Sequence, residues 1–512
     1  MLLSARTFRR RSRLAVFIFI GVIVYVARRN RVSLESVHAH LPEHLKAGPS
    51  WWSRRGRGID RLLADVSNST LGFKEIFVVN LPARTDRSDA MALAASLTDL
   101  RLTFSPGVDH KTVQDRVLPA DSAGQPIPEG NKGSWRAHMN VLRQIIEQNL
   151  TTALVMEDDI DWDVRIKTQM VSFALAAQVY GQPQRGAKKS LSQLHTPPFD
   201  KGSRGIPDSG GANLMRKWQH LNGPDQAQEH THLQHRTVAT ADAEGYTQKK
   251  HEVSLAKAPP YNMPATSPYG DDWDVLWLGH CGTEFPVSPP SQAKRPDTNV
   301  GGQGGGPSSS PAQLSLLRVT MSDDATVPDP ANLRPHPFAS PDRLGELCPP
   351  QTRVVHASSG TLCTQAYAVS QRGARKLLYQ FGLASFTTGF DLMMRDWCDG
   401  MYRQGPGTTP RRKRARASGK PTDKEDERLE EPLPQCLTVQ PPLFSHYLTA
   451  KETNSDIGAQ GGGFLHKTGS QYIRLSVQQN LRRLANGVSL AGLKDQWPGG
   501  KQEHENKKQG AQ

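Results

Sequence analysis

The chain has 512 residues, enough for a large core and more than one domain. Only 36% of the residues are apolar, and 44 Gly and 37 Pro accompany them, so we expect long unstructured segments rather than one fully ordered globule. The net charge of +14 does not indicate nucleic-acid binding by the folded part. Residues 1–60 hold 12 Lys/Arg against 3 Asp/Glu, so most of the basic excess lies at the start of the chain.

An apolar run from Leu14 to Ala27 lies between two groups of arginines. It is shorter than the ~20 residues of a typical membrane span, but flanking arginines can snorkel. The sequence at 26–29 is a poor signal-peptide cleavage site. We therefore expect a cytosolic basic tail at 1–13 and an uncleaved signal anchor at 14–29, with the remainder lumenal. A core-type helix or a transit peptide is the alternative.

The first ordered element is expected after a basic, aperiodic stem at residues 30–70. Residues 73–81 are rich in β-branched and aromatic side chains and predict a strand, which Pro82 ends. Arg84 and Arg87 follow in the loop, where guanidinium groups are well placed to bind phosphate. Surface charges at the start of a helix are an equally good interpretation of this segment alone.

A helix at 91–97 and a second strand at 102–105 follow, and this strand ends near Asp109. Gly133 and Ser134 then predict a helix start with Ser134 as a candidate N-cap. A helix N-terminus can hold a diphosphate through its free N–H groups. His138 either faces such a site or is a satisfied histidine of the core, and the core is the default.

Residues 153–156 form an unbroken apolar run that runs directly into acidic residues. The run predicts a buried strand. In open α/β sheets, ligands bind outside the carboxyl ends of strands, and carboxylate oxygens are the ligands that Mg²⁺ and Mn²⁺ prefer. A solvated acidic loop is the alternative. Five carboxylates follow the strand: Glu157, Asp158, Asp159, Asp161 and Asp163.

The rest of the chain reads as a core interrupted by insertions. Strand and helix patterns return at 272–279, 353–378 and 435–443. Between them, composition predicts insertions near 181–265, 286–345 and 405–433 and a C-terminal tail at 461–512 with one amphipathic helix.

The five cysteines all lie in the second half of the chain. Five is odd, so at least one is free or intermolecular if the others pair, and without a CxxC spacing no zinc site is indicated. Glycosylation sequons begin at Asn68 and Asn149, the second in a position expected to be more enclosed.

Four segments, in order, resemble the motifs of glycosyltransferase family 25, which includes lipopolysaccharide and procollagen galactosyltransferases. Residues 80–87 resemble its NLxxRxDR opening, and residues 157–159 match its EDD motif. Residues 130–138 resemble its GxxGCxxSH motif, with Ser and Ala at the Cys and Ser positions. Residues 366–378 match its late strand–turn–helix.

The resemblance implies a GT-A-like α/β domain over 71–460, with a mixed, mostly parallel sheet. It also implies an inverting enzyme of the Golgi or ER membrane that moves a sugar, with galactose favoured, from a UDP-sugar to a glycan or protein hydroxyl using Mn²⁺ or Mg²⁺. Along an extended chain Glu157 and Asp159 point one way and Asp158 the other. The resemblance favours Asp158 and Asp159 as metal ligands and Glu157 as structural or ribose-facing.

An inverting transfer also needs a carboxylate base to take the proton of the acceptor hydroxyl. Asp391 is the first candidate, and Asp274 is the second. A catalytically inactive interaction protein of the same fold is one alternative, and a protein that binds nucleic acid through residues 411–416 is a less favoured one. The residues expected to bind the nucleotide sugar are Asn80, Arg84, Arg87, Asp109, Gly133, His138 and Glu157.

Overall fold

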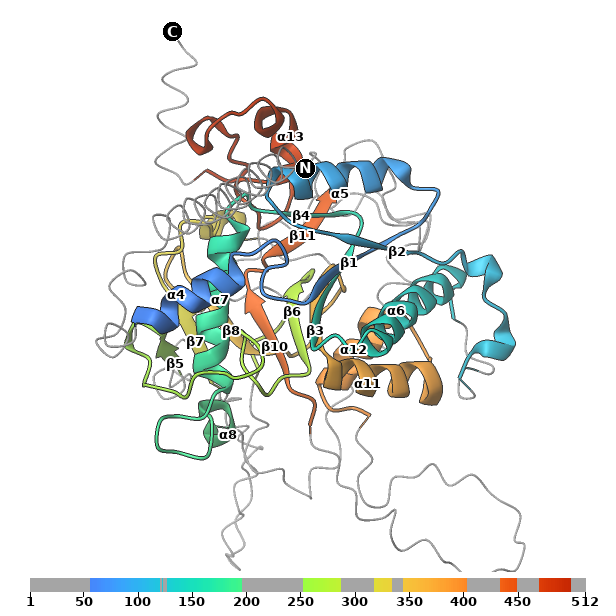
Figure 1. Ribbon diagram of the computed structural model, residues 1–512, viewed down its shortest axis with the longest axis horizontal. Helices are drawn as coiled ribbons and strands as arrows, with labels where there is room; N and C mark the ends of the chain where they lie inside the picture. Colours follow the sequence, from blue (N-terminus) through green and yellow to red (C-terminus); the bar gives the residue numbers. More distant parts are fainter. Residues whose placement is uncertain are drawn as a thin grey trace, which may run out of the picture.

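The computed structural model describes residues 56–119, 122, 127–195, 252–286, 317–333, 344–402, 433–448 and 469–498. Their strands form one 12-stranded sheet with helices on both faces (Figure 1). The strands are β1 (Glu75–Asn80), β2 (Thr103–Pro106), β3 (Thr152–Glu157), β4 (Ile160–Trp162), β5 (Glu252–Ser254), β6 (Val275–Gly279), β7 (Arg318–Met321), β8 (Arg353–Ala357), β9 (Ala366–Ser370), β10 (Cys436–Gln440), β11 (Phe444–Leu448) and β12 (Gly469–Ser470).

The helices include two long ones, which flank β3 in the sequence. The α-helices are α4 (Gly56–Val66), α5 (Thr85–Leu97), α6 (Glu129–Glu147), α7 (Ile166–Gly181), α8 (Leu191–His195), α10 (Leu344–Leu347), α11 (Gln371–Tyr379), α12 (Phe390–Cys398) and α13 (Val477–Ala485). Short 3₁₀ turns are η1 (His110–Thr112), η2 (Asp115–Val117), η6 (Leu255–Lys257), η7 (Pro330–Asn332) and η10 (Leu490–Gly492), and η8 (Gln380–Ala384) is a π turn.

The strand order is β2-β1-β3-β9-β6-β10-β8-β7-β5. The first three strands are parallel, and α5 and α6 cross between them as in a doubly wound fold. β9 is antiparallel to both β3 and β6, and β8 is antiparallel to both β10 and β7. All other strands on this path run in one direction, so the predicted mixed sheet with mostly parallel strands is confirmed.

Side chains alternate across the sheet and build two cores. In β3, Leu154 and Met156 pack with α4, α5 and α7, whereas Ala153 and Val155 pack with α6, α11 and α12. Figure 1 shows these two helix groups on opposite sides of the central strands. Because both faces are covered, the strands are apolar without interruption, which is why the run at 153–156 was recognisable from the sequence.

A small ribbon extends the sheet at its carboxyl edge. β4 pairs antiparallel with β11, which also touches β6 where Phe444 lies beside Gly279. A Cβ on Gly279 would lie 2.9 Å from the Phe444 Cβ and 2.9 Å from the Ala366 nitrogen, so only glycine allows this close approach. The glycine therefore helps to set where β11 lies at the edge.

The α6 helix begins earlier than the sequence indicated. Its first residue is Glu129, and Pro128 occupies the N-cap position without a side-chain hydrogen bond. Ser134 is thus inside the helix, and its predicted role as an N-cap is wrong. Gly133 is needed for packing: a Cβ there would lie 2.4 Å from the Val108 carbonyl oxygen. Because glycine has no Cβ, the loop after β2 can lie directly against the helix.

The folded region also extends beyond the expected bounds. In α4, which begins inside the predicted stem, Leu62, Leu63 and Val66 are buried. The C-terminal segment 469–498 packs against β4 and α5, and its expected amphipathic helix is α13. Both ends complete the core that covers one sheet face.

The predicted insertions also contain parts of the fold. The buried strand β7 lies inside the expected spacer at 286–345, and β5 and α8 lie inside the one at 181–265. β7 was missed because its four residues follow a long Gly/Pro-rich stretch. Residues 196–251, 287–316 and 403–432 lie outside the described residues.

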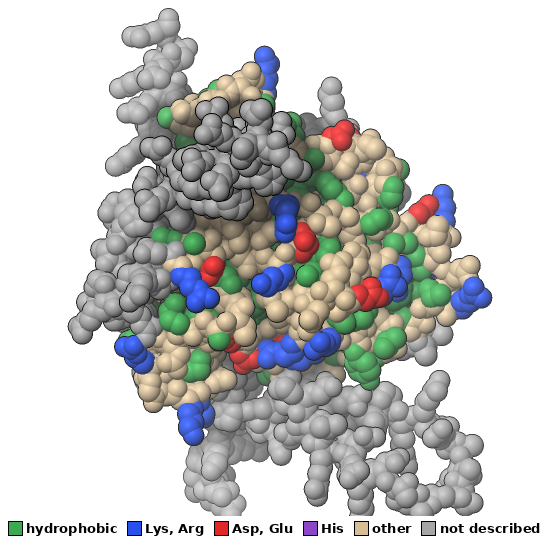
Figure 2. All heavy atoms as spheres, in the orientation of Figure 1, with side chains coloured by type: hydrophobic (Ala, Val, Ile, Leu, Met, Phe, Trp, Pro, Cys, Tyr) green, Lys and Arg blue, Asp and Glu red, His purple; other side chains and the backbone are tan. Residues whose placement is uncertain are grey.

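The helices in the described ranges are too short or too polar to cross a bilayer. The anchor predicted at 14–29 and the basic run at 411–416 lie outside those ranges. On the face drawn in Figure 2, Lys and Arg side chains are interspersed with Asp and Glu and do not form one basic patch.

Candidate functional site

The candidate site lies at the carboxyl ends of β1 and β3. The chain leaves β1 toward β2 on one side, whereas β3 pairs with the other side of β1, so the strand order changes direction here. Ligands of open α/β sheets bind at such switch points. Asn80 ends β1, and Glu157 ends β3. Asp158 and Asp159 form the turn into β4.

Both carboxylate oxygens of Asp158 accept hydrogen bonds, one from a residue of β1 and one from a residue of α5. The Asn80 amide donates to its Oδ2 at 2.7 Å, and Arg87 Nη1 donates to its Oδ1 at 2.7 Å. Burial and the charge of Asp159 raise the pKa of Asp158, while Arg87 and Asn80 act in the opposite direction. Because both oxygens are occupied, Asp158 is poorly suited to bind metal, and the structure does not favour its prediction as a metal ligand.

Glu157 and Asp159 instead converge with a histidine of β11. His446 Nε2 lies 3.3 Å from Asp159 Oδ1 and 3.7 Å from Glu157 Oε2. One ligand atom from each of these three residues lies within 4.8 Å of the other two. The β4–β11 pairing causes this, since it sets His446 opposite Ile160 and joins the Tyr447 nitrogen to the Asp159 carbonyl at 2.9 Å.

Two atoms of this triad are buried without a hydrogen bond, Asp159 Oδ1 and His446 Nε2. The two atoms lie 3.3 Å apart and form an ion pair, so each has a charged partner although neither makes a well-oriented hydrogen bond. Burial disfavours the charge on His446, but Asp159 and Glu157 outweigh it and raise its pKa to about 10. Burial likewise opposes ionisation of Asp159, but His446 and Arg87 hold its pKa at about 2. At neutral pH His446 therefore carries the positive charge beside the two carboxylates, and it must lose its proton to act as a metal ligand.

The last two carboxylates of the acidic stretch are structural anchors. Asp161 accepts hydrogen bonds from the Ser470 and Ser476 hydroxyls and the Gln478 nitrogen. Asp163 pairs with Arg165 at 2.7 Å and accepts from the Leu475 nitrogen at 3.0 Å. Both side chains are fully buried. They hold the C-terminal segment on β4 and lie outside the triad.

Asp391, the first candidate base, is the second residue of α12 and lies at the same edge of the sheet as the triad. Its Oδ2 accepts from the Cys363 nitrogen at 3.3 Å. Burial raises its pKa, and the negative charge of Glu157 raises it further, which places the two carboxylates within electrostatic range. A buried carboxylate with a raised pKa suits a proton acceptor.

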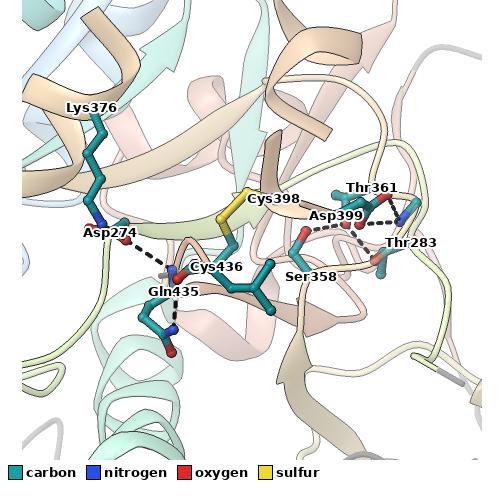
Figure 3. Close-up of a disulfide and its surroundings, with 11 residues drawn as sticks. Asp274, Thr283, Ser358, Thr361, Lys376, Cys398, Asp399, Gln435 and Cys436 are labelled. Carbon is teal, nitrogen blue, oxygen red and sulfur yellow. Dashed lines mark hydrogen bonds and ion pairs between the residues drawn. A yellow bond between two sulfur atoms is a disulfide. The ribbon is translucent and has the colours of Figure 1, made fainter. Parts of the chain in front are cut away.

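Asp274, the second candidate base, lies at the opposite edge of the sheet. It precedes β6, and its carboxylate pairs with Arg372 at 2.7 Å and Lys376 at 2.8 Å and accepts from the Gln435 nitrogen at 3.0 Å (Figure 3). Every partner of this buried group is a neighbouring element of the fold, and the group lies away from the triad, so the structure favours a structural role over that of a base. Asp274 joins β6, α11 and β10.

The other predicted nucleotide-binding residues divide between the rim and the core. Arg84 pairs with exposed Asp86 at 2.8 Å, and its carbonyl accepts from the Asn80 amide. Asp109 is exposed and caps η1. His138 is buried, stacks on Phe390 with ring centroids 4.2 Å apart, and has a pKa lowered to about 4 by burial.

The assignment of His138 and Gly133 to the nucleotide-sugar site is therefore not supported. His138 Nδ1 lies 3.0 Å from the Tyr367 hydroxyl, the arrangement of a satisfied core histidine. Gly133 lies against Val108 in the loop after β2.

The site residue that the sequence did not reveal is His446. It lies in a five-residue strand, and the nearest recognised pattern was the run at 435–443. Thr364, whose hydroxyl donates to Glu157 Oε1 at 2.9 Å, was also missed. His446 lies in β11, which follows the carboxyl end of β10, and Thr364 lies two residues before β9. Their nearness to the acidic stretch is visible only once the strand order is known.

Fold and site together define an α/β protein with two carboxylates and a histidine at its switch point, a group that could hold a metal ion. Residues 73–182 match the sequence model of glycosyltransferase family 25, described as an LPS biosynthesis protein family. The family resemblance is thereby confirmed over the segment that holds β1, β3 and the acidic stretch, and the class it indicates is a glycosyltransferase. Asp391 and His446 lie outside the matched segment.

Individual relatives match about a fifth of the chain. Procollagen galactosyltransferase 1 of Danio rerio is 28% identical over 111 residues, which is 20% of this chain and 18% of the relative. A glycosyltransferase 25 family member of Anopheles gambiae is 31% identical over 116 residues, 20% of each chain. A probable inactive glycosyltransferase 25 family member 3 of Bos taurus is 23% identical over 113 residues, 20% of this chain and 19% of the relative. The chain thus spans about a fifth of the length of the relatives it matches.

Proposed function

We propose that this protein is an inverting, metal-dependent glycosyltransferase that moves a sugar from a UDP-sugar to a hydroxyl of a glycan or protein. Galactose is the first donor sugar to test, because relatives of the matched segment carry the name procollagen galactosyltransferase. The observation that carries the proposal is the convergence of Glu157, Asp159 and His446 at the switch point of a family 25 segment.

The chemistry of the triad fits a divalent cation. Asp159 Oδ1 and His446 Nε2 are buried without hydrogen bonds, and both lie close to Glu157 Oε2. Carboxylates suit Mg²⁺ and Mn²⁺, whereas imidazole suits transition metals, so the mixed set favours Mn²⁺. When bound, the ion would neutralise charge that develops on the departing diphosphate.

Neighbouring residues hold the triad in place. Arg87 lies 3.2 Å from Asp159 Oδ2 and 2.7 Å from Asp158 Oδ1, so it fixes the turn between β3 and β4. Asn80 binds the same turn from the end of β1. This arrangement keeps the ligand atoms oriented before any substrate arrives, which is how a rigid site lowers the cost of binding.

Asp391 is the group we assign to the acceptor hydroxyl. In this role its carboxylate would accept the hydroxyl proton as the oxygen attacks the anomeric carbon from the face opposite the leaving diphosphate, so the configuration inverts. Its raised pKa brings it nearer to a neutral working pH than an exposed aspartate.

We also propose that the folded domain faces the lumen of the Golgi or ER. Two disulfides, Cys281–Cys363 and Cys398–Cys436, support an oxidising compartment. Cys348 is buried and belongs to neither of these disulfides, as the odd cysteine count requires of one cysteine. The basic and apolar N-terminal run supports membrane attachment, and membrane fractionation tests it.

UDP release from UDP-galactose and UDP-glucose, with and without Mn²⁺, tests the enzymatic proposal. We expect Mn²⁺-dependent release that Asp391→Asn lowers by about 100-fold or more while Mn²⁺ binding is kept. The matched control is Asp115→Asn, an equal change at a carboxylate that is 81% exposed and paired with Lys132.

Two outcomes would overturn the proposal. Absence of both UDP binding and UDP release would favour an inactive interaction protein, like the relative named as probably inactive. If UDP release were the same with Mn²⁺, without it and after chelation, the triad would have no metal-binding role in the reaction.

A further inference from the structure

The Cys281–Cys363 disulfide lies at the same edge of the sheet as the acidic triad. It joins the segment after β6 to the segment before β9, with Cα atoms 5.5 Å apart and 82 residues between them in sequence. The second disulfide, Cys398–Cys436, lies at the other edge, beside Asp274 and Gln435 (Figure 3). Only the first is close to the groups of the proposed reaction.

Cys363 has an unusual backbone for a residue with a side chain. Its φ of 65° falls in the left-handed region, which is strained for residues other than glycine. In this conformation its N–H donates to Asp391 Oδ2, and its carbonyl accepts from Trp277 Nε1 at 2.8 Å. Strain of this kind persists only where the surrounding structure enforces it, and Cys363 is the positive-φ residue among those described that also carries a disulfide.

The next two residues reach the metal-binding side of the site. The buried Thr364 hydroxyl donates to Glu157 Oε1 at 2.9 Å. The Gln365 carbonyl accepts from the Glu157 nitrogen at 3.0 Å. Residues 363–365 therefore touch both the proposed base and one proposed metal ligand.

We propose that Cys363 and Thr364 are positioning residues, and that the Cys281–Cys363 disulfide holds the 363–365 segment so that Asp391 and Glu157 keep their places. This rests on the proposed function. The disulfide acts on the backbone, since it holds Cys363 in the left-handed conformation that directs its N–H to Asp391. Thr364 acts through its hydroxyl on Glu157 and thereby on cation binding.

The first experiment separates the backbone conformation from the covalent bond. Both Cys281→Ser/Cys363→Gly and Cys281→Ser/Cys363→Val remove the disulfide, but glycine adopts the left-handed conformation freely and valine resists it. We expect the glycine variant to keep kcat within about threefold of the unaltered chain and the valine variant to lose about tenfold or more. Equal losses in the two variants would overturn the role of the strained backbone.

The second experiment keeps the disulfide and changes only the hydroxyl. Thr364→Val removes the donor to Glu157, and Thr364→Ser retains it. We expect the valine variant to need about tenfold more Mn²⁺ for half-saturation, measured from the free Mn²⁺ signal in electron paramagnetic resonance, and the serine variant to match the unaltered chain. Equal Mn²⁺ affinity in both variants would overturn the role of Thr364.

The other disulfide provides the matched control. Cys398→Ser/Cys436→Ser should lower the melting temperature but leave kcat of the folded protein within about twofold. A loss of kcat as large as that of the Cys281→Ser/Cys363→Val variant would show that removal of either disulfide lowers kcat. That result would overturn the specific role of Cys281–Cys363. If the unaltered chain releases no UDP from UDP-sugars, the proposed function fails. The Mn²⁺ affinities of the Thr364 variants then still decide the positioning role.

Discussion

The two edges of the sheet both contain buried carboxylates, but their surroundings differ. At the amino edge, Asp274 has two cations and a backbone N–H, all within 3.0 Å. At the carboxyl edge, Asp159 and His446 each retain a buried atom without a hydrogen bond. Asp159 also has two cationic partners, Arg87 and His446, but at 3.2 and 3.3 Å, and the His446 contact lacks hydrogen-bond geometry. The contrast separates structural from functional acids where residue type alone cannot.

The largest expected effect is at Asp159. Asp159→Asn keeps the size of the side chain but removes a ligand charge, so Mn²⁺-dependent UDP release should fall by more than about 100-fold with little change in melting temperature. UDP release and calorimetry on the same preparation measure both. Survival of the activity would remove the triad from the proposed mechanism.

A smaller effect is expected at His446. His446→Gln removes the only nitrogen ligand of the triad, and the Mn²⁺ concentration for half-maximal activity should rise by about 10–100-fold. Mn²⁺ titration of UDP release measures it. An unchanged Mn²⁺ requirement would show that Glu157 and Asp159 bind the ion without the histidine.

Asp274→Asn should give the reverse pattern. Arg372 and Lys376 lose their shared partner, but both are partly exposed and can be hydrated, so the free energy of unfolding should fall by about 2 kcal/mol. Urea unfolding measures this loss. The kcat of the folded protein should stay within about twofold, and a selective loss of kcat would return Asp274 to the list of candidate bases.

The smallest effect is expected at His138, a buried side chain that belongs to neither of the two carboxylate clusters. Its folded pKa of about 4 is below the ordinary value of 6.5, so the unfolded chain binds its proton more readily. Its stabilising contribution is present above pH 6.5 and is lost as the pH falls toward 4. From pH 7 to 5.5 the unaltered chain should lose about 1 kcal/mol more than His138→Gln, as measured by urea unfolding. Equal losses would contradict this assignment.

The sequence revealed the part of the site that is built locally. Asn80, Arg87 and residues 157–159 each follow a strand with a strong apolar pattern, and the carboxyl ends of parallel strands meet. Side-chain alternation also indicated that Glu157 and Asp159 face one way and Asp158 the other, as the structure shows. The family resemblance favoured Asp158 over Glu157 as a metal ligand. That choice set aside the side-chain alternation, which had grouped Glu157 with Asp159.

What the sequence did not reveal depends on pairing between distant segments. His446 reaches Asp159 only through the β4–β11 ribbon, and a three-residue strand such as β4 has too short a pattern to predict its partner. Asp274 appeared catalytic because its cations, Arg372 and Lys376, follow about 100 residues later. The strand β7 was hidden by its Gly/Pro-rich surroundings.

The anchoring of Asp161 by Ser470 has a consequence for how the protein is made. The two residues are 309 positions apart, and His446 lies between them in the sequence. A chain under synthesis can therefore form β1, β2 and β3 and their helices long before the triad exists. The acidic stretch must wait, with its carboxylates in water, until the segment around 470 has emerged. Ribosome-bound chains that end before His446 should carry β1, β2 and β3 and no capacity to bind Mn²⁺ at the triad.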